Sequence, residues 1–230
     1  MREIVLDTET TGFDPYDGHR IVEIGAVELI NHVPSGETYH QYINPCRLMP
    51  EEAFAVHGLG DDFLKDKPLF EAVGQAFLDF VDDAPLVIHN ASFDMKFLNA
   101  ELGWMNAPKL HDERAVDTLL IARRRFPGAP ASLDALCRRF GIDNSMREKH
   151  GALLDSEILA EVYLELIGGR QPGLSLDSAR RGSGLAEDGA PWRARPRPQP
   201  LAPRITDKEA AAHDAFIEGL GPDAVWAQQR

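Results

Sequence analysis

The segment LDTETTG, residues 6–12, constrains the fold of this chain most strongly, because it sets two acids at the end of a strand-like run that begins with Ile4 and Val5. Asp7 and Glu9 are two residues apart, so both side chains leave an extended chain on the same face. Two carboxylates held together at the end of a buried strand repel each other and lose hydration, which costs free energy unless a positive group lies between them. The segment therefore predicts a strand that ends at a cation site.

The first 170 residues alternate between strand-like and helix-like patterns. Three β-rich runs with short links favour antiparallel neighbours, and the alternation of strand and helix that follows implies a mixed sheet with helices on its faces. The sequence therefore predicts an α/β fold with a mixed five-stranded sheet flanked by helices. The expected strands are residues 3–8, 21–30, 39–43, 85–89 and 115–117, and the expected helices are 69–81, 92–102, one ending near Phe126, one between Ser132 and Gly141, and 153–167.

The composition of the chain changes after residues 1–170. Residues 171–204 hold six prolines and six arginines without periodic apolar residues, which predicts an extended or disordered linker. A helical pattern returns in residues 205–230, where Thr206 and Glu209 form a capping-box pattern. So short a segment cannot build a core of its own, so we expect a flexible linker followed by a short helical tail that docks on another protein.

The formal net charge of −13 and the two cysteines limit the classes of function. Cys46 and Cys137 argue for neither a disulfide framework nor a zinc site, and they favour a reducing, cytoplasmic setting. The longest apolar runs are too short to cross a membrane, and the acids near the start argue against a signal peptide. The negative charge argues against binding nucleic acid by bulk electrostatics, so a polyanionic substrate would require bound cations or a partner protein.

Two further acids lie on the apolar faces of predicted helices. Asp155 is four residues before Leu159 and shares its stripe, and Asp94 lies in the first helical turn after the fourth strand. Each acid alone has an ordinary alternative, such as an exposed strand end, a favourable helix dipole or a core arginine partner. Together with Asp7 and Glu9 they make four carboxylates that a mixed sheet would bring together, and such oxygen-rich clusters select Mg²⁺ or Mn²⁺.

Four carboxylates balance the charge of two divalent ions. A pair of metals roughly 3.5–4 Å apart is a recurring device for in-line displacement at phosphorus, which predicts a site that breaks phosphodiester bonds. His150 precedes Asp155 by five residues, in the loop that enters the last long helix. A neutral imidazole there could take the proton from the attacking water, whereas the other histidines, such as His19, fit surface or strand-end positions.

The motifs that carry these residues resemble those of the DEDD exonucleases, in their histidine-containing subclass. They are Asp7-x-Glu9, then HNASFD with Asp94, then HGALLD with His150 and Asp155. The resemblance implies a ribonuclease H-like fold, two divalent metal ions (Mg²⁺ or Mn²⁺) bound by the four acids, and His150 as the general base.

Residues 133–166 are similar to the epsilon proofreading subunits of bacterial DNA polymerase III, and the likeness extends over about residues 1–170. This resemblance implies a 3′–5′ DNA exonuclease that trims single-stranded or frayed 3′ ends and releases nucleoside 5′-monophosphates. It also implies that four residues contact the terminal nucleotide, namely Thr10, Val56, His57 and Phe93. The alternative for His57 is a loop histidine beside a glycine turn.

The C-terminal residues resemble partner-binding segments of the same subunits. The sequence QPGLSL resembles the peptide that bacterial proteins insert into the sliding clamp, through Gln171, Leu174 and Leu176. The tail resembles the segment that binds the polymerase III alpha subunit, through His213, Phe216, Ile217, Leu220 and Trp226. Two alternatives stay open: an exonuclease that trims RNA 3′ ends, and a scaffold that bridges clamp and polymerase.

Overall fold

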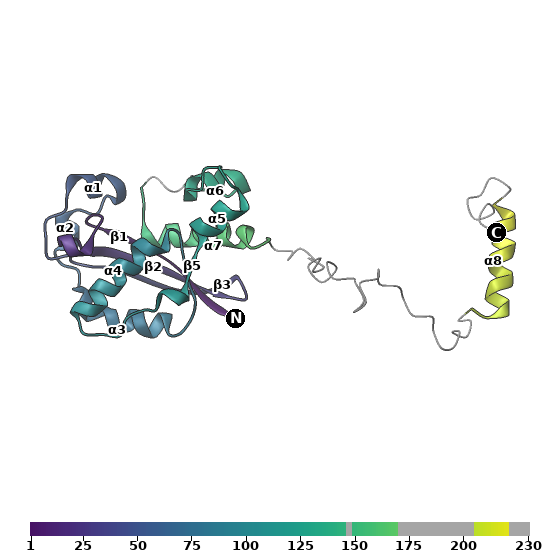
Figure 1. Cartoon of the computed structure of the whole chain (residues 1–230), viewed down its shortest axis with the longest axis horizontal. Helices are drawn as coiled ribbons and strands as arrows, with labels where there is room; N and C mark the ends of the chain where they lie inside the picture. The colour runs from purple at the N-terminus through teal and green to yellow at the C-terminus, as the bar shows by residue number, and fades with distance from the viewer. Residues whose placement is uncertain (146–148, 170–204, 221–230) are drawn as a thin grey trace, which may run out of the picture. The chain divides into compact units, whose positions relative to one another are not determined.

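The computed structural model describes residues 1–145, 149–169 and 205–220, which belong to two units (Figure 1). The first unit holds a five-stranded sheet and seven α-helices, and the second holds the helix α8, Asp207–Gly219. The strands are β1 (Arg2–Thr10), β2 (Ile21–Ile30), β3 (Val33–Tyr42), β4 (Leu86–Ile88) and β5 (Ala115–Asp117). The helices of the first unit are α1 (Glu51–His57), α2 (Asp61–Leu64), α3 (Phe70–Val81), α4 (Ala91–Trp104), α5 (Thr118–Arg125), α6 (Leu133–Phe140) and α7 (Ala152–Leu166).

The sheet has the strand order β3-β2-β1-β4-β5. β1, β2 and β3 are antiparallel neighbours, whereas β4 runs parallel to both β1 and β5. The mixed five-stranded sheet is therefore confirmed. β1 lies at the centre of the sheet, and this position brings the acids at its end close to elements from both halves of the domain.

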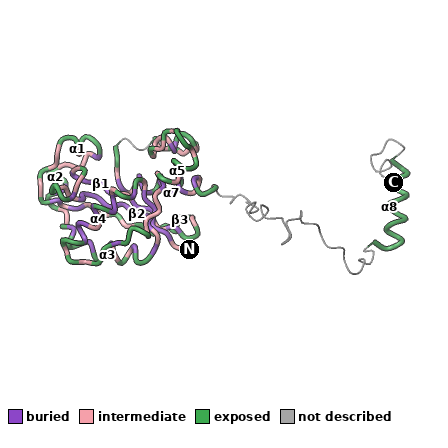
Figure 2. The backbone as a smooth tube through the Cα atoms, viewed as in Figure 1, coloured by how far each residue is buried: buried purple, intermediate pink, exposed green. Residues whose placement is uncertain are grey.

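Helices cover both faces of the sheet, and the buried residues run through the middle of the domain (Figures 1 and 2). Because side chains alternate along a strand, Ile4 and Leu6 of β1 pack in the core that holds α3 and α4, whereas Val5 packs with Leu159 and Tyr163 of α7. The odd-numbered residues of β1, which include Asp7 and Glu9, therefore face α7. α5 and α6 pack against the far part of α7.

Two parts of the fold differ from the expectation. α1 and α2 were not predicted, because neither has a side-chain cap and α1 leaves Phe54 and Val56 largely exposed, so no apolar stripe marks it. β3 begins at Val33, six residues before the predicted start at 39. Its first half is an exposed edge strand that contains Pro34 and Gly36, residues that usually interrupt strands but are tolerated at a sheet edge.

Helix α8 begins with the predicted capping box. The Thr206 hydroxyl accepts a hydrogen bond from Glu209 N (3.3 Å), and the Glu209 carboxylate accepts one from Thr206 N (2.9 Å). Of the residues expected to dock, Phe216 and Leu220 are exposed, His213 is exposed, and Ile217 is buried. The residues Gln171, Leu174, Leu176 and Trp226 lie outside the described part of the chain. No helix within the described ranges combines the length and apolarity that crossing a bilayer requires.

The first turn of α7 lies directly against β2. The Ser156 hydroxyl lies 2.9 Å from the carbonyl oxygen of Gly25, and a Cβ atom at Gly25 would overlap the backbone of Ala152 and Leu153. In the sheet register, Gly25 pairs with Asp7 of β1. The missing side chain therefore lets the start of α7 approach the strand pair that carries the acids.

Replacing Gly25 by alanine should destabilise the domain. The added methyl meets backbone, which cannot rotate away, so we expect a loss of about 1–3 kcal/mol or more in the free energy of unfolding, measured by urea titration. Gly103 in α4 is the matched control, because a Cβ there meets nothing within 4 Å. Gly103→Ala should leave the stability unchanged or raise it by up to about 1 kcal/mol. Equal effects of the two substitutions would contradict the packing of α7 on Gly25.

Candidate active site

β1 carries the first two acids of the site. Its pairing with β2 is regular from Arg2 to Glu9 and shifts between Glu9 and Thr10. Glu9 is only 8% exposed, although it lies near the end of the strand. Such a shift in register redirects the chain, and bulges of this kind are frequent beside active sites. The strand therefore holds Asp7 and Glu9 on the face that α7 covers.

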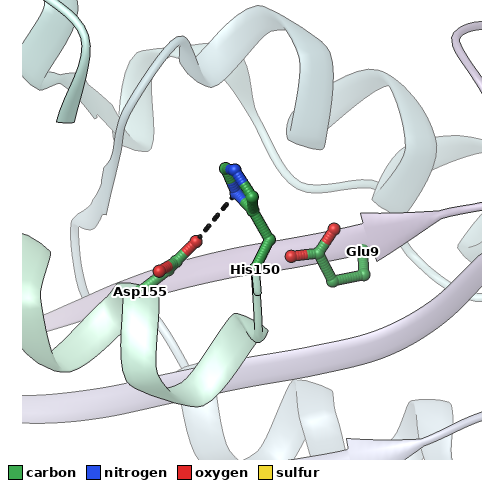
Figure 3. A group of neighbouring side chains, drawn as sticks. All are labelled: Glu9, His150 and Asp155. Carbon is green, nitrogen blue, oxygen red and sulfur yellow. Dashed lines mark ion pairs between the residues drawn. The ribbon is translucent and has the colours of Figure 1, made fainter. Parts of the chain in front are cut away.

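α7 brings Asp155 and His150 to this face. Asp155 is 2% exposed and lies in the first turn of the helix, and its Oδ2 is 3.2 Å from His150 Nδ1. Glu9, His150 and Asp155 each offer one donor atom, and these three atoms lie within 4.8 Å of one another. Figure 3 shows the three side chains pointing toward a common space, Glu9 from β1, Asp155 from the first turn of α7 and His150 from the segment that leads into α7. His150 N also donates a hydrogen bond to Val56 O (3.2 Å), which connects this loop to α1.

α4 carries Asp94 in its first turn. The side chain is 3% exposed, and its Oδ1 accepts a hydrogen bond from the Thr8 hydroxyl (2.7 Å). Burial raises the pKa of Asp94 to about 7, with a further contribution from the negative charge of Asp117. Asn90, the residue before α4, has a left-handed backbone (φ 70°), which turns the chain sharply from β4 into the helix.

All five predicted catalytic residues line one cavity of about 570 Å³. A second cavity of about 550 Å³ adjoins it, and it is lined by all four residues expected to contact the nucleotide: Thr10, Val56, His57 and Phe93. The two cavities share Thr8, Glu9 and Phe93. The structure thus brings the five predicted catalytic residues to one cavity and places the four predicted substrate-contact residues in the cavity beside it.

His57 has a defined orientation at the wall of this second cavity. It is almost fully buried, and its Nδ1 accepts a hydrogen bond from Leu59 N (3.0 Å), which leaves the proton on Nε2. Burial lowers the pKa of His57, so the neutral ring is favoured. A neutral imidazole with a fixed tautomer suits directional contact with a ligand better than a charged surface histidine would.

A partly buried ion pair that the sequence patterns miss holds the loop between β1 and β2. Arg20 donates two hydrogen bonds to the Glu101 carboxylate (2.8 and 2.6 Å), and Ile21 N donates a third (3.2 Å). Arg20 N also donates to the Thr11 hydroxyl (3.0 Å). The pair ties α4 to the loop that lines the second cavity. The one sign of this ion pair in the sequence is that Glu101 occupies a position of the helical pattern at which an apolar residue is expected.

The donor set fits hard divalent cations. The carboxylates of Glu9 and Asp155 and the imidazole of His150 form one close group, and Asp7 and Asp94 line the same cavity. Carboxylate oxygens are the ligands that Mg²⁺ and Mn²⁺ prefer. A cation in this cavity would also favour the ionised form of Asp94, which burial otherwise disfavours. The chemistry of the residues therefore agrees with a metal-dependent hydrolytic site.

Comparisons with known proteins agree with the geometry. The model of the RNase_T family, described as exonuclease, matches residues 4–163. DNA polymerase III subunit epsilon of Escherichia coli is 44% identical over 238 aligned positions, which cover 98% of this chain and 97% of the relative. The protein of the same name from Rickettsia felis is 55% identical over 179 residues, covering 76% of this chain and 78% of the relative. The chain belongs to the DNA polymerase III epsilon family of exonucleases.

Solved structures of exonucleases share the fold. Exonuclease X in complex with 5′ overhanging duplex DNA is 27% identical, covers 71% of this chain and 90% of its own, and has a TM-score of 0.56. The nuclease domain of 3′hExo, a DEDDh family member bound to rAMP, is 18% identical with a TM-score of 0.63, over 72% of this chain and 91% of its own. The ribonuclease H-like fold expected for the epsilon family is thereby confirmed, and the DEDDh exonucleases generally use divalent metal ions.

Replacing Asp94 by asparagine should change how stability depends on pH in metal-free protein. Because the folded-state pKa of Asp94 is raised to about 7, its contribution to stability is fully present below the unfolded value of 3.8 and is lost as pH rises through about 7. The loss is on the order of 2–4 kcal/mol. Asp94→Asn should remove this decline, so the variant gains stability relative to the parent between pH 5 and about pH 8.

Urea unfolding in EDTA at the two pH values measures this difference, since the other titrating groups contribute equally to parent and variant. Added Mg²⁺ should raise the melting temperature of the parent more than that of the variant. Parallel pH profiles for the two proteins would show that burial does not raise the pKa of Asp94.

Proposed function

We propose that this chain is the proofreading 3′–5′ exonuclease of a bacterial replicative polymerase, with Asp7, Glu9, Asp94 and Asp155 holding two divalent ions, Mg²⁺ or Mn²⁺. The observation that carries the proposal is the convergence of these acids and His150 on one cavity, beside a second cavity of about 550 Å³ that the four predicted substrate-contact residues line. The names of the epsilon relatives support the substrate and the polymerase context.

The carboxylates act by binding cations at fixed positions. When bound, the two ions neutralise the acids and stabilise the negative charge on the attacking and leaving oxygens of the phosphodiester. The protein's part is to fix the ligands: the Thr8 hydroxyl orients Asp94, and the first turn of α7 orients Asp155. Both acids are nearly fully buried, so the surrounding protein rather than solvent sets the positions of their side chains.

His150 acts as the general base. Its Nδ1 lies beside Asp155 while 46% of the side chain is exposed, so the imidazole can take the proton from the attacking water and release it to solvent. The water oxygen bonds to phosphorus, and the bond from phosphorus to the 3′-oxygen of the preceding nucleotide breaks. The terminal nucleotide then leaves as a 5′-monophosphate, and the 3′-oxygen of the shortened strand takes a proton from solvent to become a 3′-hydroxyl.

The second cavity selects unpaired ends. Thr10, Val56, His57 and Phe93 surround space for one nucleotide, which a base in a duplex cannot enter without unpairing. A mismatched end needs less free energy to unpair than a matched end, so it reaches the site more often. Selectivity for mismatched ends therefore arises largely when the end unpairs, before the phosphodiester bond is hydrolysed.

The second part of the proposal concerns the C-terminal residues of the chain and the partners that they bind. We assign residues 1–170 to the exonuclease domain, residues 171–204 to a clamp-binding motif with a linker, and residues 205–230 to a tail that docks on the polymerase III alpha subunit at the cytoplasmic replisome. The alignment with the E. coli relative supports this division, because it covers 98% of the chain and so includes the tail. A tethered enzyme receives the DNA end from its partner at high effective concentration. A chain of net charge −13 requires this, because its own charge repels DNA.

Replacing Asp7 by alanine should abolish exonuclease activity. Loss of one metal ligand should lower kcat/KM on a 3′-mismatched primer by at least about 100-fold, measured by release of 5′-mononucleotides. Asp79→Ala is the matched control, because Asp79 is an exposed acid on α3 outside both cavities, and it should retain parent activity. His150→Ala in the same assay should lower kcat by about 10²–10⁴-fold with KM little changed.

RNA of the same sequence serves as the second substrate. Faster cleavage of RNA than of DNA by the parent would favour an RNA-trimming enzyme. Retained hydrolysis in purified Asp7→Ala protein would reject the assignment of the site.

Replacing Phe216 by aspartate in the full chain should weaken binding to the polymerase III alpha subunit. Phe216 is 65% exposed on α8 of this chain. If the partner buries this aromatic side chain in the complex, a charge in its place costs at least about tenfold in affinity. Ala211→Asp, also exposed on α8, is the control and should bind like the parent. Surface plasmon resonance measures the affinities, and both variants should keep parent nuclease activity on free single-stranded DNA. Unchanged binding by Phe216→Asp would contradict docking through this residue.

A further inference from the structure

Three consecutive arginines end helix α5, and each has a different environment. Arg125 donates hydrogen bonds to the carbonyl oxygens of Glu165 and Leu166 (both 2.6 Å), so it ties α5 to the end of α7. Arg124 is exposed and lines neither of the two cavities. Arg123 is also exposed, but it lines the catalytic cavity together with the acids. A structural role accounts for Arg125, whereas Arg123 places a cation in a cavity whose other titratable residues, within the described part of the chain, are Asp7, Glu9, His89, Asp94, Asp134, His150 and Asp155.

α5 is fixed relative to the catalytic residues at its first turn as well. The Asp117 carboxylate accepts hydrogen bonds from Leu119 N (2.8 Å) in α5 and from Ala91 N (3.2 Å) at the start of α4. The Thr118 hydroxyl lies 3.2 Å from Ile88 O at the end of β4. Since Arg125 anchors the other end, α5 cannot move independently of the elements that carry Asp94 and Asp155.

One face of α5 forms part of the cavity wall. Leu119 and Arg123 are four residues apart, so they lie on the same side of the helix, and both line the cavity. Ser132, Leu133 and Asp134 at the start of α6 complete this wall. None of these residues lines the adjoining cavity, which is bounded instead by the β1–β2 loop and α1. Figure 1 shows α1 and α6 well apart from each other in the domain.

This arrangement sets the direction of a bound strand. The terminal nucleotide occupies the cavity beside α1, and the bond to be cut lies where the two cavities share Thr8, Glu9 and Phe93. The preceding nucleotides therefore leave along the remaining wall, which α5, α6 and the turn from β4 into α4 (His89 and Asn90) form. The first phosphate on that wall is the second phosphate from the 3′ end, and it must pass a cavity rich in negative charge.

From this geometry, and resting on the proposed function, we infer that Arg123 binds the second phosphate from the 3′ end of the strand. A guanidinium matches the geometry of a phosphate through paired N–H groups, and it offsets the repulsion between the phosphate and the acids. Arg123 does not touch the bond that is cut. It holds the strand in register with the catalytic residues, so its contribution depends on the presence of that phosphate.

Two substrates separate this role from a general effect on the active site. Thymidine 5′-(p-nitrophenyl phosphate) has the terminal nucleotide and a scissile ester but no second phosphate, whereas a short single-stranded oligothymidylate has both. Arg123→Met should lower kcat/KM on the oligonucleotide by about 10–100-fold, the value of a charge-assisted hydrogen bond. The same variant should cleave the small ester within about twofold of the parent, since that substrate lacks the phosphate. Arg124→Met should match the parent on both substrates.

A chemical substitution in the DNA completes a double-mutant cycle. An oligonucleotide with a neutral methylphosphonate at the second linkage should lose as much kcat/KM with the parent as Arg123→Met loses on ordinary DNA. With Arg123→Met the same methylphosphonate should cause little further loss, because the interaction is already absent. Arg123→Lys should retain part of the parent rate, since it keeps the charge without the fork of donors.

Three results would overturn the inference. Equal losses on the small ester and the oligonucleotide would show that Arg123 acts on the catalytic residues themselves. Multiplying losses from the methylphosphonate and Arg123→Met would show that they affect different interactions. If the parent protein and Arg123→Met release nucleotides from DNA equally fast, the role of Arg123 is rejected and the proposed function stands. If the parent protein cleaves neither substrate, the proposed function is rejected together with the role of Arg123.

Discussion

Mutual repulsion between buried carboxylates is the constraint on which the rest of this structure depends. Asp94 and Asp155 are each no more than 3% exposed, and both lie beside the strand that carries Asp7 and Glu9. The fold accepts this because rigid elements hold every acid, and because α7 reaches the sheet over Gly25. Bound cations relieve the repulsion only if the acids cannot move apart. The stability of the domain and its proposed metal binding are therefore two consequences of one arrangement.

The sequence predicts those parts of the structure in which local pattern and tertiary environment agree. β1, α3 and α7 have regular apolar spacing and bury the corresponding faces, and the four acids stand out because they interrupt that spacing. α1 and α2 could not be predicted, because they are short and uncapped, and their positions are set by contacts such as His150 N to Val56 O. Arg20 with Glu101, and Arg123 at the cavity wall, were missed for a related reason. From the sequence alone an arginine is expected to be exposed, and only the fold shows which residues face it.

An acidic chain that acts on a polyanion must confine its positive charge to a few positions. Within the described residues, the positive charge at the site comes from the proposed metal ions and from Arg123, while the net charge of the chain is −13. Such a distribution gives little non-specific affinity for duplex DNA. A low intrinsic affinity suits an enzyme of the epsilon family, because a tight non-specific complex would remove correctly paired ends as well as wrong ones. The proposed docking through the tail would then supply proximity without adding charge.

The contacts around the second cavity connect the proposed nucleotide site to His150, the proposed general base. Val56 lines that cavity, and its carbonyl oxygen accepts the hydrogen bond from His150 N, so α1 and the loop before α7 share one contact. On the opposite wall, the ion pair of Arg20 with Glu101 fixes the loop that contributes Thr10 and Thr11. If the second cavity binds the terminal nucleotide as proposed, the residue that lines it is joined to the backbone of His150 by one hydrogen bond. The proposed general base is therefore held by the same element that bounds the proposed nucleotide site, which favours a fixed geometry for hydrolysis.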